Sequence, residues 1–366
     1  MEYKRLGDIA SYINGYAFKP EQRGSEGLPI IRIQDLTGNA YDLGFYDGDY
    51  PKKIEINDGD VLISWSASLG VYIWNRGKAL LNQHIFKVSF DKAEVDKEYF
   101  VFAVKHKLAE MVSKTHGATM KHIVKKDFDN TKVPFPSLEK QAEIATVLSK
   151  VSSVIDARQA ELQKLDDLIK ARFVEMFGDP QVNPFGWNTV NISKVVGGKV
   201  SNGFFAKRDD YVDDGNVSVL GVANIVNRMY SKVYELPRTN ADEKDIEKFE
   251  VKYGDMLFCR SSLVAEGIGK ASIIPEDVQG NVLFECHVIR LPLDLNKCVP
   301  EFVQTLSTME FFRNQVIAQS KTATMTTIGQ DGILKTDIIL PPIDKQREFY
   351  DFVKQVDKSK FVKKRM

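Results

Sequence analysis

Short apolar runs separated by turn residues dominate most of the chain. Stretches such as IIRI (30–33), DVLISW (60–65) and HIFKVSF (84–90) are rich in β-branched and aromatic residues and are bounded by Gly, Asp or Asn. Runs of this length and composition predict β-strands. Two longer segments, 97–114 and 300–319, place apolar residues three and four positions apart, which predicts helices.

A third helical segment, 139–178, occupies the middle of the chain and contains neither proline nor glycine before Gly178. At about 1.5 Å per residue it would form a rod of about 60 Å. Its apolar residues recur at steps of four and three, a spacing typical of coiled coils. We therefore predict a helix interface formed by Ile144, Leu148, Val151, Ile155, Leu162, Leu165, Ile169 and Phe173.

The chain also repeats itself. Four pairs of matched positions occur in the same order, and the offset between partners grows from 188 to 195, 203 and 205 residues. Loop insertions in one of two homologous units would produce such a slowly growing offset. The matched pairs are Asn14 with Asn202, Asp60 with Asp255, His84 with His287, and Gln141 with Gln346.

Each unit reads as several strands, a helix and a final strand, so we predict an α+β fold with two homologous domains in a pseudo-two-fold arrangement. The long coiled-coil helix joins them, and a shorter helix after Gln346 is expected to run antiparallel to it. Because the second helix is shorter, we expect residues 160–176 to lack an intramolecular partner and to be covered by another subunit or a second copy. The predicted segments are residues 1–138 (first domain), 139–178 (central spacer helix), 179–343 (second domain) and 344–366 (short C-terminal spacer helix).

Composition narrows the class of protein. The chain has 366 residues, 43% of them hydrophobic and 27% charged, and a formal net charge of zero. Zero net charge argues against a protein that coats nucleic acid with its whole surface, but it allows a local basic face. The three cysteines form no CxxC pair, which indicates reduced thiols and argues against a zinc site. With no apolar leader and no run near the roughly 18 residues of a membrane span, we expect a cytoplasmic protein without membrane contact.

The sequence contains no recognisable catalytic motif. It has no GxxxxGK[ST] loop and no glycine-rich cofactor loop, and the stretch Asn183-Pro184-Phe185 lacks the second proline of a DNA amino-methyltransferase box. We therefore expect no cofactor, no metal and no catalysis by the chain itself. Two alternatives to a recognition protein stay open: a self-associating coiled-coil scaffold or regulator with two ligand-binding domains, and an enzyme with a dispersed active site.

The order of these features resembles the specificity (S) subunits of type I restriction-modification systems. The resemblance covers essentially the whole chain and rests on the segments GDVLIS and GDMLFC, on NQHI, on GATM followed by PFPSLEKQAEI, and on the long helix that ends in FVEMFGDP. In that family each unit is a target recognition domain for one half of a bipartite site in double-stranded DNA. The helices hold two modification (methyltransferase) subunits, and restriction and translocase subunits join that core.

The resemblance implies a non-catalytic DNA-specificity subunit. Because the two units differ in sequence, we expect them to read different half-sites and the whole target to be asymmetric. The uncovered part of the central helix would then bind a partner subunit, or a second copy of the chain by self-association. Any use of S-adenosylmethionine or ATP would belong to the partner subunits.

We expect the DNA contacts to come from loops that carry basic, amide and hydroxyl side chains, because these groups bind phosphates and base edges. Arg260 is expected to make a bidentate contact to guanine, whereas His84 and His287 are expected to be structural members of strands. Each loop is equally compatible with a purely structural role, and the two Asn-Gly segments with hairpin tips. The candidates in the first unit are Asn14, Tyr16, Lys19, Arg32, Gln34, Ser66, Lys114, Thr115, His116, Thr119 and Lys121. Those in the second are Asn202, Phe204, Lys207, Arg208, Asn224, Arg260, Ser261, Lys321, Thr322 and Thr324.

Overall fold

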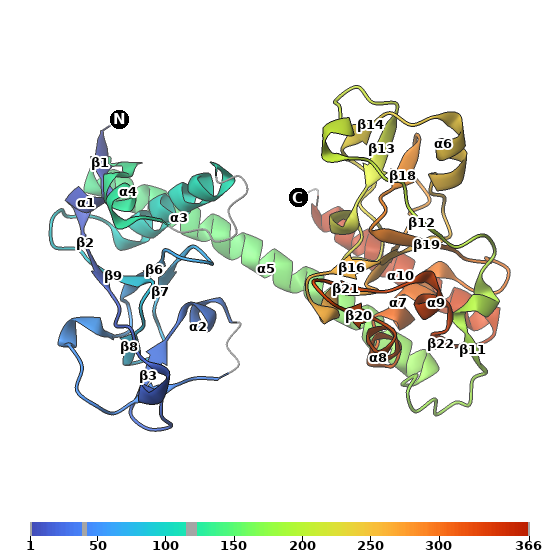
Figure 1. The fold of residues 1–366 in the computed structure, drawn as a ribbon, viewed down its shortest axis with the longest axis horizontal. Coiled ribbons are helices and arrows are strands. Elements are labelled where there is room, and N and C mark those ends of the chain that lie inside the picture. The colour runs from blue at the N-terminus through green and yellow to red at the C-terminus, as the bar shows by residue number, and fades with distance from the viewer. Residues whose placement is uncertain (1, 39–41, 115–122, 365–366) are drawn as a thin grey trace. The chain divides into compact units, whose positions relative to one another are not determined.

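The computed structural model describes residues 2–38, 42–114 and 123–364 (Figure 1). The chain divides into two compact units, Met1–Arg158 (unit 1) and Gln159–Met366 (unit 2). The helix α5 (Leu138–Phe177) begins in unit 1 and ends in unit 2. Each unit is therefore described with its own part of this helix.

Within the described residues, the strands of unit 1 form three sheets, ordered β2-β9-β6-β7, β4-β3-β8-β5 and β1-β10. All neighbours are antiparallel except β3 and β8. The strands are β1 (Tyr3–Arg5), β2 (Ser11–Asn14), β3 (Leu28–Ile31), β4 (Phe45–Tyr46), β5 (Glu55–Ile56), β6 (Val61–Ser64), β7 (Gly70–Ile73), β8 (Ala79–Leu81), β9 (Ile85–Ser89) and β10 (Lys132–Pro134). The helices that accompany them are α1 (Leu6–Ile9), α2 (Ile33–Thr37), α3 (Lys97–Lys114) and α4 (Lys125–Asn130).

Unit 2 repeats this pattern with sheets ordered β12-β19-β15-β17, β14-β13-β18 and β11-β22, and adds a small sheet, β16-β21-β20. Only β13 and β18 are parallel neighbours. The strands are β11 (Thr189–Asn191), β12 (Ser201–Asn202), β13 (Val217–Leu220), β14 (Arg238–Thr239), β15 (Asp255–Cys259), β16 (Ser261–Ser262), β17 (Ala271–Ile273), β18 (Val282–Phe284), β19 (Val288–Pro292), β20 (Lys321–Thr322), β21 (Thr326–Thr327) and β22 (Asp337–Ile339). The helices are α6 (Glu243–Phe249), α7 (Pro300–Ser307), α8 (Glu310–Ala318), α9 (Gln330–Leu334) and α10 (Ile343–Lys364).

The same backbone crossing recurs in both units and explains the repeated Asn-Gly pair. The Tyr16 N–H donates to the Leu81 carbonyl (2.8 Å), and the Phe204 N–H donates to the Phe284 carbonyl (2.7 Å). A Cβ atom at Gly15 would lie 2.0 Å from a backbone oxygen, and one at Gly203 would lie 2.2 Å from another. The glycine is thus needed because two backbone segments approach closely. The alternative of a hairpin tip at these pairs is wrong.

The repeated Lys-Gln phrase has an equally specific structural role. The Asp96 N–H donates to Gln141 Oε1 (3.0 Å), and Gln141 Nε2 donates to the Pro136 carbonyl (2.8 Å). In unit 2, Gln346 makes the matched pair of bonds, accepting from the N–H of Val299 (3.0 Å) and donating to the carbonyl of Pro341 (2.8 Å). Both glutamines are buried. We call each set of contacts a glutamine clamp, because it ties the start of a long helix to the residue that precedes an earlier helix of the same unit, α3 in unit 1 and α7 in unit 2.

One predicted helix is broken. The helix expected over 300–319 is divided into α7 and α8, with Thr308 and Met309 between them. The hydroxyls of Thr305, Ser307 and Thr308 donate to backbone carbonyls three or four residues earlier in α7. Such bonds compete with the helical pattern, which accounts for the interruption.

The central helix α5 has the predicted length, but the part of it that packs on a second helix differs from the prediction. Within unit 2, Phe173 packs edge-to-face on Phe349 (5.6 Å between centroids), and Lys360 forms an ion pair with Asp166 (2.6 Å). These contacts show that α10 runs antiparallel to α5, as predicted. The expectation that residues 160–176 lack an intramolecular partner is therefore wrong. An antiparallel helix starting at Ile343 meets the end of α5 first, so it covers that end.

The exposed apolar face lies in the other half of α5. Its residues are 38–60% exposed. At 100° per residue they all fall within one third of the helix circumference, so they form one stripe. Of the predicted interface residues, Ile169 and Phe173 are buried, Ile144, Leu162 and Leu165 are half-buried, and the rest lie on this exposed face. The exposed α5 face consists of Val147, Leu148, Val151, Val154 and Ile155.

Candidate nucleic-acid interface

In unit 2 the small sheet β16-β21-β20 brings together residues that are far apart in sequence. Ser261 pairs with Thr327, which in turn pairs with Lys321. The hydroxyls of Thr322 and Thr326 lie 3.0 Å apart across the hairpin. The predicted residues Ser261, Lys321 and Thr322 thus share one structure, and Thr324 lies exposed in its turn. This sheet presents hydroxyl and ammonium donors to solvent.

Arg260 lies next to this sheet and is held by the backbone. Its N–H donates to the carbonyl of His287 (2.9 Å), and its Nη1 donates to the carbonyl of Cys286 (3.1 Å). The rest of the guanidinium has no partner among the described residues, so it keeps donors for a bidentate contact. His287 Nδ1 lies 2.7 Å from the Ser261 hydroxyl oxygen, which links the turn before β19 to the small sheet.

Exposed apolar side chains flank the small sheet. Leu263 and Val264 follow β16 and are 84% and 58% exposed, and Met325 precedes β21 and is 36% exposed. Phe205, next to the predicted Phe204, is 68% exposed. Phe204 itself packs on Phe249 (6.0 Å) in the core. These exposed side chains escaped the sequence analysis, because apolar residues at strand ends look like core.

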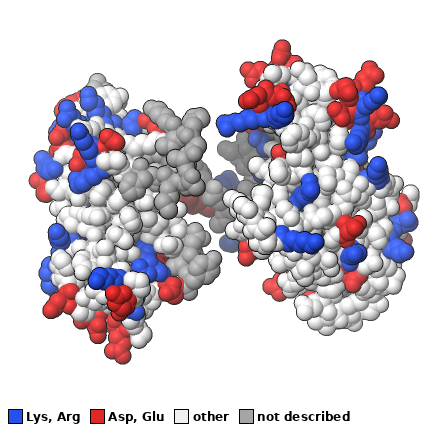
Figure 2. Space-filling view, viewed as in Figure 1, with Lys and Arg blue, Asp and Glu red and all other residues white. Residues whose placement is uncertain are grey.

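The other predicted residues of unit 2 are less suited to DNA. Asn224 caps a short helical turn by accepting from the N–H of Gly221 (3.0 Å), and Asn202 is half-buried in β12. Lys207 and Arg208 are exposed but adjoin the acidic stretch 209–214. Figure 2 shows Asp and Glu side chains, with Lys and Arg side chains among them, over the end of unit 2 that carries β13, β14 and α6. The aspartates of the stretch 209–214 would repel DNA phosphates.

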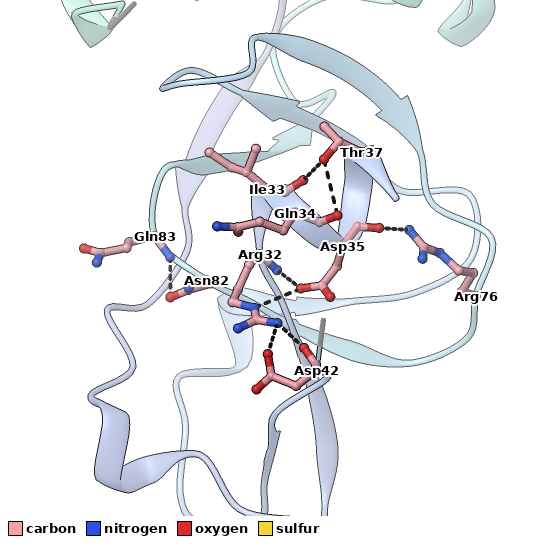
Figure 3. Close-up of polar contacts among 9 residues, drawn as sticks. All are labelled: Arg32, Ile33, Gln34, Asp35, Thr37, Asp42, Arg76, Asn82 and Gln83. Carbon is pink, nitrogen blue, oxygen red and sulfur yellow. Dashed lines mark hydrogen bonds and ion pairs between the residues drawn. The ribbon is translucent and has the colours of Figure 1, made fainter. Parts of the chain in front are cut away.

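In unit 1, Arg32 is engaged within the protein (Figure 3). Its Nε donates to Asp35 Oδ2 (3.2 Å), and its Nη2 donates to the carbonyl of Asp42 and lies 3.4 Å from the carboxylate of Asp42. The Asp35 carboxylate also accepts from the Arg32 N–H (2.8 Å), and Arg76 donates to the Asp35 carbonyl (2.8 Å). Arg32 therefore stabilises the turn that leads into α2, and its donors are largely used.

The amides of two glutamines beside this cluster are available instead. Gln34 lies on α2 and Gln83 in the turn between β8 and β9, and both are exposed. Figure 3 shows the two side chains on the side of the cluster away from Arg76, with no contact drawn to either amide. Tyr16, which is 40% exposed, lies beside Gln83, because the Gln83 N–H donates to the Tyr16 carbonyl (2.9 Å). The segment NQHI contains Gln83, but only the fold shows that its side chain is exposed.

The remaining residues predicted for unit 1 have mixed placements. Asn14 Oδ1 accepts from Trp65 Nε1 (3.3 Å), and Ser66 is half-buried in the turn after β6. Lys19 is exposed at the start of a short helical turn, as Lys207 is in unit 2. Thr115, His116, Thr119 and Lys121 lie outside the described residues, and so does the side chain of Lys114.

The two histidines lie in matched turns rather than in strands. His84 has a φ of +72° and follows β8, and its ring contacts Trp65 at 4.9 Å. The N–H of Trp65 donates to the His84 carbonyl (3.2 Å), as that of Arg260 does to His287. Trp65 and Arg260 thus occupy the same place in the two units. The backbone frame is shared, while the side chains it presents differ.

No cluster of three or more His, Cys, Asp or Glu residues that could bind a metal occurs in the part of the chain that the structure describes. In the same part, none of the helices is long and apolar enough to span a membrane.

Comparisons with known proteins follow the same two-unit pattern. The family model of the type I restriction modification DNA specificity domain matches residues 1–167 and 184–365. The specificity subunit of the type I restriction enzyme EcoBI of Escherichia coli is 24% identical over 389 residues, covering 96% of this chain and 78% of that protein. The MjaVIII specificity subunit of Methanocaldococcus jannaschii is 23% identical over 375 residues, covering 97% and 86%. The crystal structure of the type I S subunit of M. genitalium aligns with a TM-score of 0.50 at 12% identity, covering 100% of this chain and 91% of that one.

Proposed function

Because the chain belongs to the family of type I restriction-modification DNA specificity domains, we propose that each unit reads one half of a bipartite, asymmetric DNA target. The observation that carries this proposal is a shared backbone frame with different side chains. Trp65 of unit 1 stands where unit 2 has Arg260, and Gln83 stands where unit 2 has Cys286. Two similar frames with different hydrogen-bonding groups would recognise different base edges.

In unit 2 we assign base reading to Arg260, supported by Ser261 and the β20–β21 hairpin. A guanidinium held at one nitrogen can still offer two parallel donors to the O6 and N7 acceptors of guanine. Lys321 and the threonines of the hairpin suit phosphates, which position the domain without reading sequence. The exposed Leu263 and Met325 suit contact with a thymine methyl group.

In unit 1 we assign base reading to Gln34 and Gln83. A glutamine amide both donates and accepts, so it pairs with the N6 and N7 edge of adenine. Tyr16 and Lys19 lie on the same crossing segment and would contact the sugar-phosphate backbone. Arg32 would act indirectly, by fixing the turn that positions Gln34.

The chain is a DNA-specificity component rather than an enzyme, so modification must come from partner subunits. We propose that the exposed α5 face receives a modification subunit, and that two such subunits and the restriction subunits assemble around the helices. Five exposed apolar side chains in a 120° stripe are typical of an interaction surface. The alternative of a self-associating scaffold is not favoured, because it leaves the base-reading groups without a role. The cytoplasmic location stays a prediction.

The test is sequencing of methylated bases in DNA modified by the reconstituted complex. The parent chain should give a target with two different halves. Arg260→Ala should relax selectivity at one base pair of one half, by about 5- to 150-fold, the equivalent of about 1–3 kcal/mol. Arg347→Ala, on the exposed surface of α10, is the matched control and should change nothing. A uniform loss of affinity with an unchanged target would make Arg260 a phosphate contact, and a target with identical halves would contradict the proposed asymmetry.

A further inference from the structure

Unit 2 contains a cavity of about 510 Å³ that no part of the proposed recognition surface uses. It lies between α5, the loop around Arg228, the start of β17, and the helices α7 and α8. Its volume falls within the range of small-molecule sites. Buried polar residues, among them Gln304 (4% exposed), form part of its lining.

The cavity gathers positive charge from four separate elements. Lys170 comes from α5, Arg228 from the loop before β14, and Arg313 from α8, while Lys270 directly precedes β17. The one acidic residue in the lining, Asp166, already pairs with Lys360 (2.6 Å). None of the four cations has a carboxylate partner among the described residues. Such an arrangement raises the electrostatic energy of unit 2 unless an anion joins it.

The cations are also incompletely satisfied by hydrogen bonds. Arg313 Nη2 donates to the Glu266 carbonyl (3.0 Å), but the buried Nη1 has no partner within the described part of the chain. Burial lowers the pKa of Arg313 below its ordinary value. Lys270 Nζ donates to Asn227 Oδ1 (2.7 Å), which holds the ammonium in place and leaves the amide nitrogen of Asn227 as a further donor. Arg228 makes only long contacts to backbone carbonyls, at 3.4 and 3.5 Å.

We propose that this cavity is a phosphate-binding site in which Lys170, Arg228, Lys270 and Arg313 neutralise the anion and Asn227 donates to it. A phosphate oxygen accepts from both guanidinium and ammonium groups, and such charge-assisted bonds are the strong ones. The phosphate could belong to the backbone of DNA held by unit 2 or to a free phosphorylated small molecule. The DNA source rests on the proposed function, whereas the free source does not.

The experiment uses the full chain and the double variant Lys170→Gln, Lys270→Gln. Lys170 is exposed and Lys270 half-buried, so the variant should fold, and Lys170→Gln alone provides a second, milder variant. Inorganic pyrophosphate is titrated by calorimetry at low salt. The parent chain should bind at one site, and the double variant should bind at least tenfold more weakly. The matched control, Lys164→Gln with Lys194→Gln, removes two exposed lysines outside the cavity and should bind like the parent chain.

A second arm identifies the source of the phosphate. The affinity for target DNA is measured against salt concentration for the same variants. If a DNA phosphate enters the cavity, the double variant should lower the magnitude of the slope of log K against log salt by up to about 0.9, because each neutralised phosphate contributes about 0.9. An unchanged slope with lost pyrophosphate binding identifies a free phosphorylated ligand. If the cavity variants and the control variants have equal pyrophosphate affinities and equal salt slopes, the phosphate site is wrong. If the parent chain binds pyrophosphate but shows no sequence-specific DNA binding, only the proposed function is contradicted.

Discussion

The buried side-chain amides of Gln141 and Gln346 each connect two main-chain groups. Each has no more than 1% of its surface exposed and makes two hydrogen bonds to main-chain groups. A buried N–H or carbonyl that loses its partner is expensive, because neither water nor another group replaces it. These residues therefore stabilise the junction between each domain and its helix.

We predict that Gln346→Leu lowers the free energy of unfolding of unit 2 by about 2–4 kcal/mol, because it leaves the Val299 N–H and the Pro341 carbonyl unpaired. Urea unfolding followed by circular dichroism measures this change. Lys345→Ala, at the exposed neighbouring position, should cost less than about 0.5 kcal/mol. Equal unfolding midpoints for the two variants would show that the clamp does not stabilise unit 2.

Individual site residues were only partly predictable. Arg260 and Ser261 stand out in the sequence as polar groups after a strand, and the structure brings them together with His287. Arg32 has the same chemistry, but its use depends on Asp42, ten residues away in a loop whose path the sequence does not give. Gln83 was missed because a glutamine in a short turn carries no periodic signal. The exposure of a side chain is set by the fold around it.

Helix α7 carries a carboxyl group that is almost completely buried. Glu301 is the second residue of α7 and is 1% exposed. Its Oε1 accepts from the Tyr230 hydroxyl (3.0 Å), while its Oε2 has no partner in the described residues. Burial raises the pKa of Glu301 from 4.5 to about 7, and the nearby carboxylates Glu276 and Asp357 act in the same direction.

This shift predicts a pH-dependent stability of unit 2. Between pH 4.5 and about 7 the folded chain holds a proton on Glu301 that the unfolded chain has released. The stabilisation is complete below pH 4.5 and is lost as the pH rises through about 7, amounting to about 3 kcal/mol. Glu301→Gln should remove this part of the pH dependence and be the more stable form at pH 8. Urea midpoints at pH 5, 6, 7 and 8 test this, with the exposed Glu310→Gln as control; parallel curves for parent and Glu301→Gln would contradict it.

We predict that charges placed on the exposed α5 face disrupt assembly without changing the stability of the chain. Val151→Asp with Val154→Asp should leave the unfolding free energy within about 0.5 kcal/mol, because both side chains are already exposed. The same pair should abolish co-elution with a modification subunit in size-exclusion chromatography with light scattering. Thr146→Asp with Ala157→Asp places the same charges at exposed positions of α5 outside this face and should leave assembly intact. Loss of assembly in both pairs would point to charge alone rather than to this face.

The helices illustrate what periodicity can and cannot predict. The spacing of apolar residues predicted the bounds of α3 and α5 to within about one residue, because long helices without proline or glycine have a clear sequence pattern. It did not predict which half of α5 is covered, because that depends on the end at which the antiparallel partner begins. It also missed the break at Thr308, which comes from local hydroxyl bonds rather than from the apolar pattern.

Taken as one chain, the protein consists of two recognition units with separate cores. Among the described residues, the hydrophobic clusters of unit 1 contain no residue of unit 2 and the reverse, so we expect effects of the two units on DNA recognition to be independent. We predict that Gln83→Ala relaxes selectivity in one half of the target only, and that Arg260→Ala relaxes the other half only. The double variant should show the sum of both changes. Sequencing of methylated bases measures all three, and a change in both halves from one substitution would contradict independent reading.

The duplication could be predicted from matched positions and a growing offset, because insertions change loops but preserve the order of elements. The charge distribution could not. A formal net charge of zero hides a cationic cavity in unit 2. The four cations of this cavity are scattered along the chain, and only the fold brings them together.

The glutamine clamps have a consequence for how such a protein can change. Each clamp reaches an amide and a carbonyl of the main chain and no side chain of the domain it secures. A foreign domain with the same backbone path would therefore keep both clamp hydrogen bonds, although its side chains would still have to fit the apolar residues of the helices, as Phe302 fits Phe173 and Phe177. Recombination at the two phrases would exchange a whole recognition domain and, with it, one half of the DNA target. The repeated phrase would then mark the boundary of the exchanged segment.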